Sequence, residues 1–256
     1  MNHKHVEYGN EILVVLQGYP TNKNQLIDNI MHLKSYGLHN IVVSTYGQFL
    51  LNPKRKGVTL PANYVRLDKT NGMSPYYSDG PSSYLGKYKP DGLGIYYPGY
   101  INMNAHKSNV NLQIHSTLEG IKKGYTQEME FEYILKCRAD YTLDNTDNWI
   151  SKIIEQLRDI PYNTSDIFSK KLFVHCLEDW HFDDFFMFGI KEDIFRLFNI
   201  PFKQNFMSPE NYLATAYPRS QGYSSSWKTF KKNFIIDAET YNIEGVWHKK
   251  KEAGLL

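Results

Sequence analysis

Two apolar segments joined by a helical segment, all within residues 11–45, place the strongest constraint on the fold. EILVVLQG, which ends at Gly18, and NIVVST are almost continuously apolar, and such runs are typical of strands that are buried on both faces. Between them, TNKNQLIDNIMHLKSYG has helical periodicity, with Thr21 or Asn22 as its N-cap and Gly37 as its stop. This order of strand, helix and strand predicts a parallel sheet covered by helices on both faces.

The predicted sheet also indicates where a ligand would bind. In an open parallel sheet the ligand crevice lies at the carboxyl ends of the strands. QGYP and STYGQ follow the first two strands, and a further buried strand, FEYILKCRAD, ends in Arg138 and Asp140. A carboxylate at this edge can hold Mg²⁺ or Mn²⁺, and the metal would neutralise the diphosphate of a nucleotide-linked substrate. Asp140 can equally cap the turn that follows the strand, so both interpretations stay open.

Two other segments precede that strand. NVNLQIHSTLEGIKKGYTQ predicts a helix, with His115, Leu118 and Lys122 at helical spacings and Gly124 near its end. Residues 50–108 are rich in Gly, Pro, Tyr and Asn and are too long for a routine connection. We expect an ordered excursion here, because its Tyr and Ile residues supply burial that a disordered segment normally lacks.

A dense group of acidic residues surrounds Trp180 and His181. The four acids are Glu178, Asp179, Asp183 and Asp184. FFMFG then predicts a short buried strand and KEDIFRLFN a helix, so the last two acids are expected at the entry to packed structure. That placement suits a general base held within hydrogen-bond reach of an acceptor hydroxyl. For His181 we favour packing, and for the first two acids a solvated loop.

Composition and charge narrow the class of protein. A chain of 256 residues can form one large α/β domain or two small ones, and its net charge of +2 is too small to indicate a nucleic-acid or membrane-surface partner. Two cysteines give neither a disulfide framework nor zinc-site spacing, which favours a reducing compartment. The apolar run near the N-terminus is far shorter than the roughly 20 residues of a membrane span. We therefore expect a cytoplasmic protein with no transmembrane segment.

The aromatic content gives a weaker indication of the ligand. The chain contains 20 Tyr, and tyrosine side chains suit sugars, bases and protein partners because each ring pairs an apolar face with a polar tip. A biased codon composition would explain the same abundance. The tyrosines alone do not decide between these interpretations.

Four pieces of the chain resemble the WavE-type lipopolysaccharide-synthesis glycosyltransferases. They are ILVVLQGYP, NIVVSTYG, the helix and strand NVNLQIHSTLEGIKKG…FEYILKCRAD, and WHFDDFFMFGIKEDIF, and their order and spacing carry the resemblance. The resemblance implies a single α/β domain over residues 1–256, with a GT-A-like nucleotide-sugar fold and a mostly parallel Rossmann-like sheet. Residues 1–140 would form the donor half, and residues 141–256 the acceptor and catalytic half.

The resemblance also implies roles for individual acids and bases. The segment like KCRAD is a reduced Asp-x-Asp metal motif in this family, and its aspartate falls on Asp140. The family's acid five residues before a glycine falls on Asp184, with Asp183 as an additional neighbour. Because Arg138 stands where a full motif has its first acid, Arg138 and Lys136 are alternative ligands for the diphosphate.

Further donor contacts are expected by the same resemblance. His248, late in the chain, would complete the metal site, although an exposed basic tail is the alternative for this region. The remaining residues expected to line the nucleotide-sugar pocket are Gln17, Gly18, Tyr19, Thr45, Asn109 and Asn111. An ordinary turn is the alternative interpretation for Gly18, and helix capping is the alternative for the two asparagines.

The function implied is transfer of a sugar from a nucleotide diphosphate sugar, with UDP-sugar the first choice, to a hydroxyl of a glycan or glycolipid acceptor. Mn²⁺ or Mg²⁺ would be the cofactor, no nucleic acid would take part, and direct displacement would invert the anomeric centre. The site of action would be the cytosolic face of a membrane or the cytoplasm of a virus-infected host. Two alternatives remain. A sugar-phosphate nucleotidyltransferase would need a Gly-rich basic phosphate loop, which QGYPTNKNQ lacks, and a non-catalytic glycan-binding protein would use its tyrosines for stacking.

Overall fold

The computed structural model of the chain describes residues 8–18, 23–46, 63–67, 110–139, 142–143, 149–162, 168–178, 181–200, 211–215, 227–237 and 247–248. In chain order the elements are η1 (Gly9–Glu11), β1 (Ile12–Gln17), α1 (Lys23–Ser35), β2 (Asn40–Tyr46), β3 (Asn63–Leu67), α3 (Val110–Thr126), β4 (Tyr133–Arg138), β5 (Thr142–Leu143), α4 (Trp149–Asp159), β6 (Leu172–Glu178), β7 (His181–Ile190), α5 (Lys191–Phe198), α7 (Trp227–Phe234), β8 (Ile235–Asp237) and β9 (Trp247–His248).

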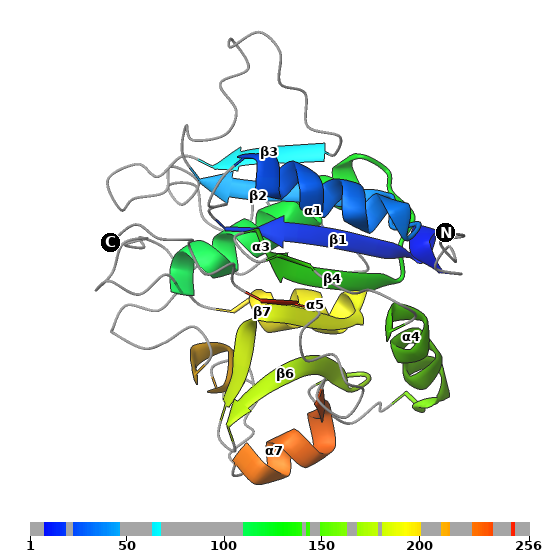
Figure 1. Cartoon of the computed structure of the whole chain (residues 1–256). Coiled ribbons are helices and arrows are strands. Elements are labelled where there is room, and N and C mark those ends of the chain that lie inside the picture. Colours follow the sequence, from blue (N-terminus) through cyan, green and yellow to red (C-terminus); the bar gives the residue numbers. More distant parts are fainter. Residues whose placement is uncertain are drawn as a thin grey trace, which may run out of the picture.

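A seven-stranded sheet in the order β3-β2-β1-β4-β7-β6-β8 forms the centre of the described structure (Figure 1). β1 pairs in parallel with β2 and β4, and β2 pairs in parallel with β3. β7 runs antiparallel to both of its neighbours, β4 and β6, whereas β6 and β8 are parallel. The sheet is therefore mixed, and the prediction of a mostly parallel sheet needs this correction at β7.

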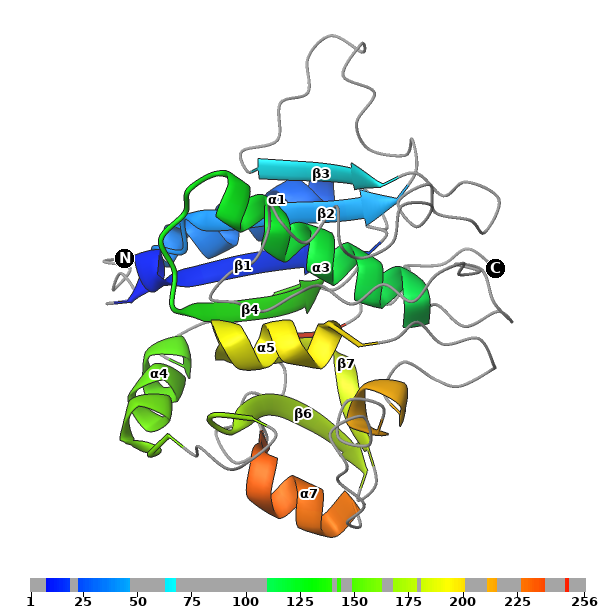
Figure 2. The ribbon, with the colours of Figure 1, turned by 180° about the vertical axis from the view of Figure 1, so that it is seen from behind.

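Helices cover both faces of the sheet, as the two opposite views show (Figures 1 and 2). α1 and α4 pack on one face against alternate residues of β1, β2 and β4, such as Ile12, Val14 and Leu135. α3, α5 and α7 pack on the other face against the intervening residues, such as Leu13, Val15 and Ile134. Because successive residues of a strand point to opposite faces, continuously apolar strands are what a sheet covered on both sides requires.

The contact between α3 and β1 is unusually close because two glycines of the helix face the strand. A Cβ atom at Gly120 would lie 2.5 Å from Val15 Cγ1, and one at Gly124 would lie 2.7 Å from Leu13 Cδ2. Any larger residue at these positions would push the helix away from the sheet. The two glycines thus set the height of α3 above the strands.

The predicted strand–helix–strand unit and the next helix and strand are confirmed as β1, α1, β2, α3 and β4. Gly37 also ends α1 as predicted: its φ is +88°, and the following Leu38 N donates to Leu33 O at 3.2 Å. The N-cap predicted at Thr21 or Asn22 lies outside the described residues. None of the described helices is long and apolar enough to cross a membrane.

Three other predictions need correction. β4 ends at Arg138, so the strand does not extend to Asp140. β7 begins at His181, before the predicted FFMFG strand, and therefore includes the positions of Asp183 and Asp184. Within residues 50–108 the sequence analysis missed β3, which extends the sheet beyond β2. The remainder of that predicted excursion lies outside the described residues.

Asp193 connects α5 to the segment before β6. Its carboxylate is fully buried and accepts hydrogen bonds from the backbone N–H groups of Ser169 and Lys170, both at 2.7 Å. Arg196 Nη1 lies 3.5 Å from the same carboxylate. Burial raises the pKa of the Asp193 carboxyl to about 6, against the lowering effect of these hydrogen bonds and of Arg196.

Replacing Asp193 with Asn should lower the free energy of unfolding by roughly 1–3 kcal/mol, because the amide turns an N–H₂ group toward a backbone N–H. The folded-state pKa of about 6 lies above the ordinary 3.8. This carboxyl's contribution to stability is therefore fully present below pH about 4 and is lost as the pH rises to about 6. Urea unfolding should show a larger difference between wild type and Asp193→Asn at pH 4 than at pH 7.

Glu192→Gln is the matched control, since it removes one negative charge from the adjacent residue of α5, whose side chain is 30% exposed. Its effect should stay within about 0.5 kcal/mol at both pH values. A difference for Asp193→Asn that grows with pH would contradict the burial argument.

Candidate functional site

The carboxyl ends of three parallel strands meet at one edge of the sheet. Gln17, the last residue of β1, lies opposite Ser44 of β2 and Arg138 of β4. Gly18 N donates to Ser44 O at 3.1 Å, and Ala139 N donates to Gln17 O at 2.8 Å. These bonds continue the ladder past the end of β1 and fix the strand ends relative to one another, as the predicted ligand edge requires.

The reversal of β7 brings the predicted catalytic acids to the same edge. Cys137 of β4 pairs with Phe186 of β7, and Asp183 and Asp184 precede Phe186 on this antiparallel strand. Residues that precede Phe186 on β7 therefore run alongside those that follow Cys137 on β4. The structure thus places the backbone of two motifs that are far apart in the sequence at one end of the sheet. The side chains of the two acids lie outside what the structure describes.

Gln17 is positioned by a helix as well as by its strand. Its side chain is 4% exposed, and its Oε1 accepts a hydrogen bond from Ser116 Oγ of α3 at 2.9 Å. Ser116 Oγ also lies 3.2 Å from the carbonyl oxygen of Gln113, one turn earlier in α3. The predicted pocket residue Gln17 is therefore held between β1 and the first turns of α3.

Gly18 is required for its backbone conformation. Its φ is +105°, a value that residues with a side chain rarely adopt, and no atom of the described residues lies within 4 Å of the position of a Cβ. None of the described residues therefore blocks an approach to this backbone. The conformation explains the glycine without any contact to another element.

Lys136 and Arg138 differ in their access to this edge. Lys136 is fully buried within β4, whereas Arg138 at the strand end is only partly buried. Residues at even positions of β4 share the α3 side of the sheet, as Ile134 does. Of the two predicted diphosphate ligands, Arg138 is the one with contact to solvent.

The predicted metal ligands are described only in part. Asp140 lies outside the described residues, but Thr142, two positions later in β5, pairs with His248 of β9. The pairing brings the backbone of the late histidine close to the segment that follows β4. Within the described ranges, no three His, Cys, Asp or Glu side chains converge in a group that would hold a metal ion.

The other predicted donor contacts lie wholly or partly outside the described structure. Tyr19 and Asn109 lie outside the described residues. Thr45 is placed in β2, where it pairs with Arg66 of β3, and Asn111 is placed in the first turn of α3. These four residues stay predictions.

The side of α3 that carries His115 holds a buried ionisable cluster. The side chains of His115, Glu119 and Lys122 are 3%, 13% and 6% exposed, and Lys122 Nζ forms an ion pair with Glu119. Burial lowers the pKa of His115 to about 4 and also lowers that of Lys122. His115 is therefore neutral at physiological pH, so its 3.9 Å approach to Glu119 is not an ion pair.

Sequence reasoning missed the polar residues on the sheet-facing side of α3. Gln113, Ser116 and Thr117 are all buried and share that side with Gly120 and Gly124. One signal in the sequence could have identified them. The two glycines mark the buried side of the helix, and the turns before them carry polar residues on the same side. Ser116, which contacts Gln17, extends the candidate site from the strand ends onto α3.

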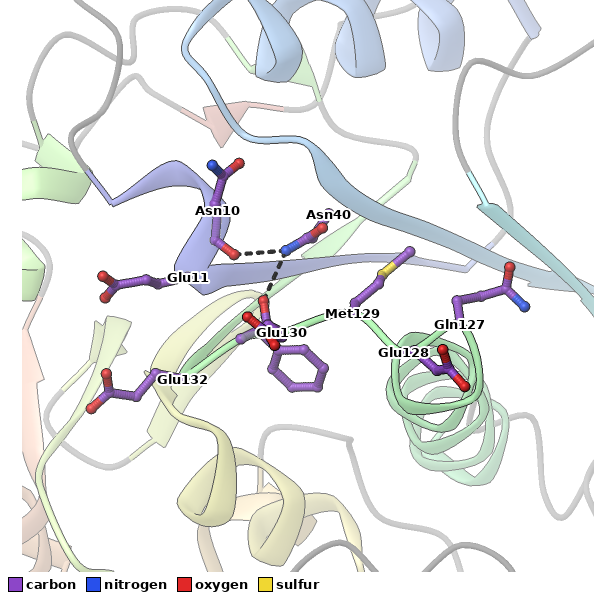
Figure 3. A pocket seen from close by; sticks show the side chains of 9 residues that line it. Asn10, Glu11, Asn40, Gln127, Glu128, Met129, Glu130 and Glu132 are labelled. Carbon is purple, nitrogen blue, oxygen red and sulfur yellow. Dashed lines mark hydrogen bonds between the residues drawn. The ribbon is translucent and has the colours of Figure 1, made fainter.

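A groove of about 660 Å³ lies at the opposite, amino-terminal edge of the sheet (Figure 3). Asn40 Nδ2 links two backbone segments that line the groove, because it donates to Asn10 O at 2.7 Å and to Glu130 O at 3.1 Å. Four glutamates, Glu11, Glu128, Glu130 and Glu132, contribute to its lining. In Figure 3 the carboxylates of Glu11 and Glu128 lie on opposite sides of the groove, so these two do not converge on one point.

The sequence model of one protein family matches residues 94–237, more than half of the chain. The family is described as WavE lipopolysaccharide synthesis, and the match extends over α3, β4, β7 and α5. No curated protein sequence matches the chain significantly. At a coarse level the family description implies a glycosyltransferase-like role, with a sugar donor and a glycan acceptor. The chain belongs to the WavE lipopolysaccharide synthesis family.

Proposed function

We propose that this protein is a glycosyltransferase with a GT-A-like donor site, which transfers a sugar from a nucleotide diphosphate sugar to a hydroxyl of a glycan acceptor. The observation that carries the proposal is the antiparallel pairing of β7 with β4. It brings the strand that contains Asp183 and Asp184 to the edge where β1 and β4 end. A donor-binding edge and a candidate base thus share one end of the sheet.

Charge and access at this edge suit a diphosphate. Arg138, at the end of β4, is partly exposed and can donate to phosphate oxygens in a bidentate manner. At Gly18 no atom of the described residues lies within 4 Å of the position of a Cβ, which would allow a ligand to approach the backbone at the end of β1. UDP is the first candidate for the nucleotide because of the resemblance of the chain to nucleotide-sugar enzymes.

In the proposed reaction, Asp184 accepts the proton of the acceptor hydroxyl while the hydroxyl oxygen forms its bond to the anomeric carbon. The bond from that carbon to the diphosphate oxygen breaks, and the electron pair leaves with the nucleotide diphosphate. Attack from the face opposite the leaving group inverts the anomeric centre. Asp183 is the alternative base, since it is the neighbouring position of the same strand.

A divalent cation would be held by Asp140 and His248. The pairing of Thr142 with His248 supports this choice, because it brings the backbone of His248 to within two residues of Asp140 along the chain. Carboxylate oxygen and imidazole nitrogen are both suitable ligands for Mn²⁺. When bound, the cation would supply positive charge for the departing diphosphate, and Arg138 would supply part of the same charge.

Nucleotide diphosphates should stabilise the protein against heat. At about 100 times its dissociation constant, a ligand adds about 2.7 kcal/mol to the free energy of unfolding. We expect a rise in Tm with UDP and Mn²⁺, a smaller rise with UDP and EDTA, and less with GDP, dTDP or CMP. Asp140→Ala should remove the difference between Mn²⁺ and EDTA.

The two outcomes separate the parts of this proposal. A Tm shift that is equal with Mn²⁺ and EDTA in the wild type would remove the metal and leave Arg138 as the diphosphate ligand. The absence of a shift with all four nucleotides would contradict the donor class itself and favour a glycan-binding protein.

Asp184→Asn should lower turnover by roughly 10²-fold or more while leaving the Kd for the nucleotide within about twofold, because the amide keeps the shape and cannot accept the proton. Steady-state transfer to a glycan acceptor, with calorimetric binding of the nucleotide in parallel, measures both quantities. If Asp183→Asn alone gives the loss, the base is Asp183.

Glu155→Gln provides the control for the loss of one negative charge, since Glu155 is exposed on α4. Its turnover should equal that of the wild type. Normal turnover in both Asp183→Asn and Asp184→Asn would refute a β7 carboxylate as the base.

A further inference from the structure

A buried serine of α3, Ser116, orients the side chain of Gln17 at the carboxyl edge of the sheet. Ser116 Oγ donates to Gln17 Oε1 at 2.9 Å, closer than its 3.2 Å approach to Gln113 O. Ser116 is fully buried and Gln17 is 4% exposed, so little water competes for this bond. The carboxamide of Gln17 therefore has a fixed direction, with its oxygen turned toward α3.

The amide nitrogen of Gln17 makes no hydrogen bond within the described structure. Its Oε1 is bonded to Ser116, and no described residue accepts a hydrogen bond from Gln17 Nε2. An amide NH₂ group carries two donor hydrogens, one of which points away from the amide oxygen. Gln17 is also the last residue of β1, opposite Arg138 and beside Gly18, where the proposed donor site lies.

We propose that Ser116 is a positioning residue for the donor site: it turns the Gln17 carboxamide so that Nε2 donates to an acceptor oxygen of the bound nucleotide diphosphate. The inference rests on the proposed function, because it requires a nucleotide at the carboxyl edge. The acceptor oxygen belongs either to the base or to the diphosphate, since both present oxygens that accept from an amide donor.

Two neighbouring hydroxyl groups indicate that the Ser116–Gln17 bond does more than satisfy a buried polar group. Ser44 Oγ and Thr117 Oγ1 are also buried, and neither has a hydrogen-bond partner within the described structure. The attachment of α3 to β1 already depends on the close contacts at Gly120 and Gly124. Other contacts therefore hold α3 in place, and the Ser116–Gln17 bond orients the Gln17 side chain at the end of β1.

Ser116→Ala and Thr117→Val form a matched pair for the test. Both remove one hydroxyl from a fully buried position of α3, but only Ser116 is bonded to Gln17. Calorimetric titration with UDP and Mn²⁺ should give a Kd about 3- to 10-fold weaker for Ser116→Ala, the scale of one oriented hydrogen bond. Thr117→Val should bind within about twofold of the wild type, and kcat at saturating donor should change little in either variant.

The variant Gln17→Met distinguishes a positioning role of Ser116 from a general effect of Ser116 on stability. If Ser116 acts through Gln17, the double variant Ser116→Ala with Gln17→Met should bind UDP no more weakly than Gln17→Met alone. Titrations with inorganic pyrophosphate and with uridine locate the acceptor. The weakening in Ser116→Ala should appear with whichever of the two probes carries the bonded oxygen.

Three results would overturn the inference, and they can be told apart. Equal UDP binding by Ser116→Ala and wild type would remove the role of Ser116 and leave the proposed function intact. Additive losses in the double variant would show that Ser116 does not act through Gln17. A wild-type protein that binds none of UDP, GDP, dTDP and CMP would overturn the proposed function and this inference together.

Discussion

The antiparallel pairing of β7 with β4 determines which parts of the chain meet at the candidate site. Without that reversal, Asp183 and Asp184 would lie at the amino-terminal edge, beside the groove lined by glutamates. With it, Cys137 and Phe186 pair, and the residues that follow β4 run alongside those that begin β7. A single change of strand direction therefore decides whether the two acidic motifs can take part in one reaction.

The second constraint is the height of α3 above the sheet. Gly120 and Gly124 allow the helix backbone to approach Val15 and Leu13 closely. Only at this height does the short side chain of Ser116 reach Gln17 across the interface at 2.9 Å. The close packing near the middle of the sheet thus has a consequence at its carboxyl edge, where it fixes the direction of an amide.

The sequence predicted the parallel half of the fold because its signals are local. Continuous apolar runs gave β1, β2 and β4, and Gly37 gave the end of α1, since a positive φ at a helix terminus strongly favours glycine. The direction of β7 was not predictable, because an apolar run carries no information about which way a strand runs. β3 was missed because NYVRL is short, is interrupted by Arg66, and lies within a segment rich in Gly, Pro, Tyr and Asn.

For the candidate site, the sequence predicted the strand ends and missed the buried polar residues of α3. Gln17 and Arg138 end recognisable parallel strands, so their edge could be predicted from topology. The edge at which the two β7 acids lie depends on the direction of β7, which the sequence did not predict. Ser116 has no such signal, because a serine within a helical pattern is ordinarily read as a surface residue. Its burial becomes evident only when the glycines of α3 show which side of the helix faces the sheet.

The polar groups on the sheet-facing side of α3 are concentrated toward one edge of the sheet. Toward the amino-terminal edge its sheet-facing side carries Gly120 and Gly124, which contact the apolar side chains of Val15 and Leu13. Toward the carboxyl edge the same side carries Ser116 and Thr117, and β2 presents Ser44 beneath it. Two of these hydroxyls lie buried without partners in the described structure, at a cost of roughly 1–3 kcal/mol each. Stability is therefore lowered at the edge where the ligand is proposed to bind, which is where departures from optimal packing are expected in a functional protein.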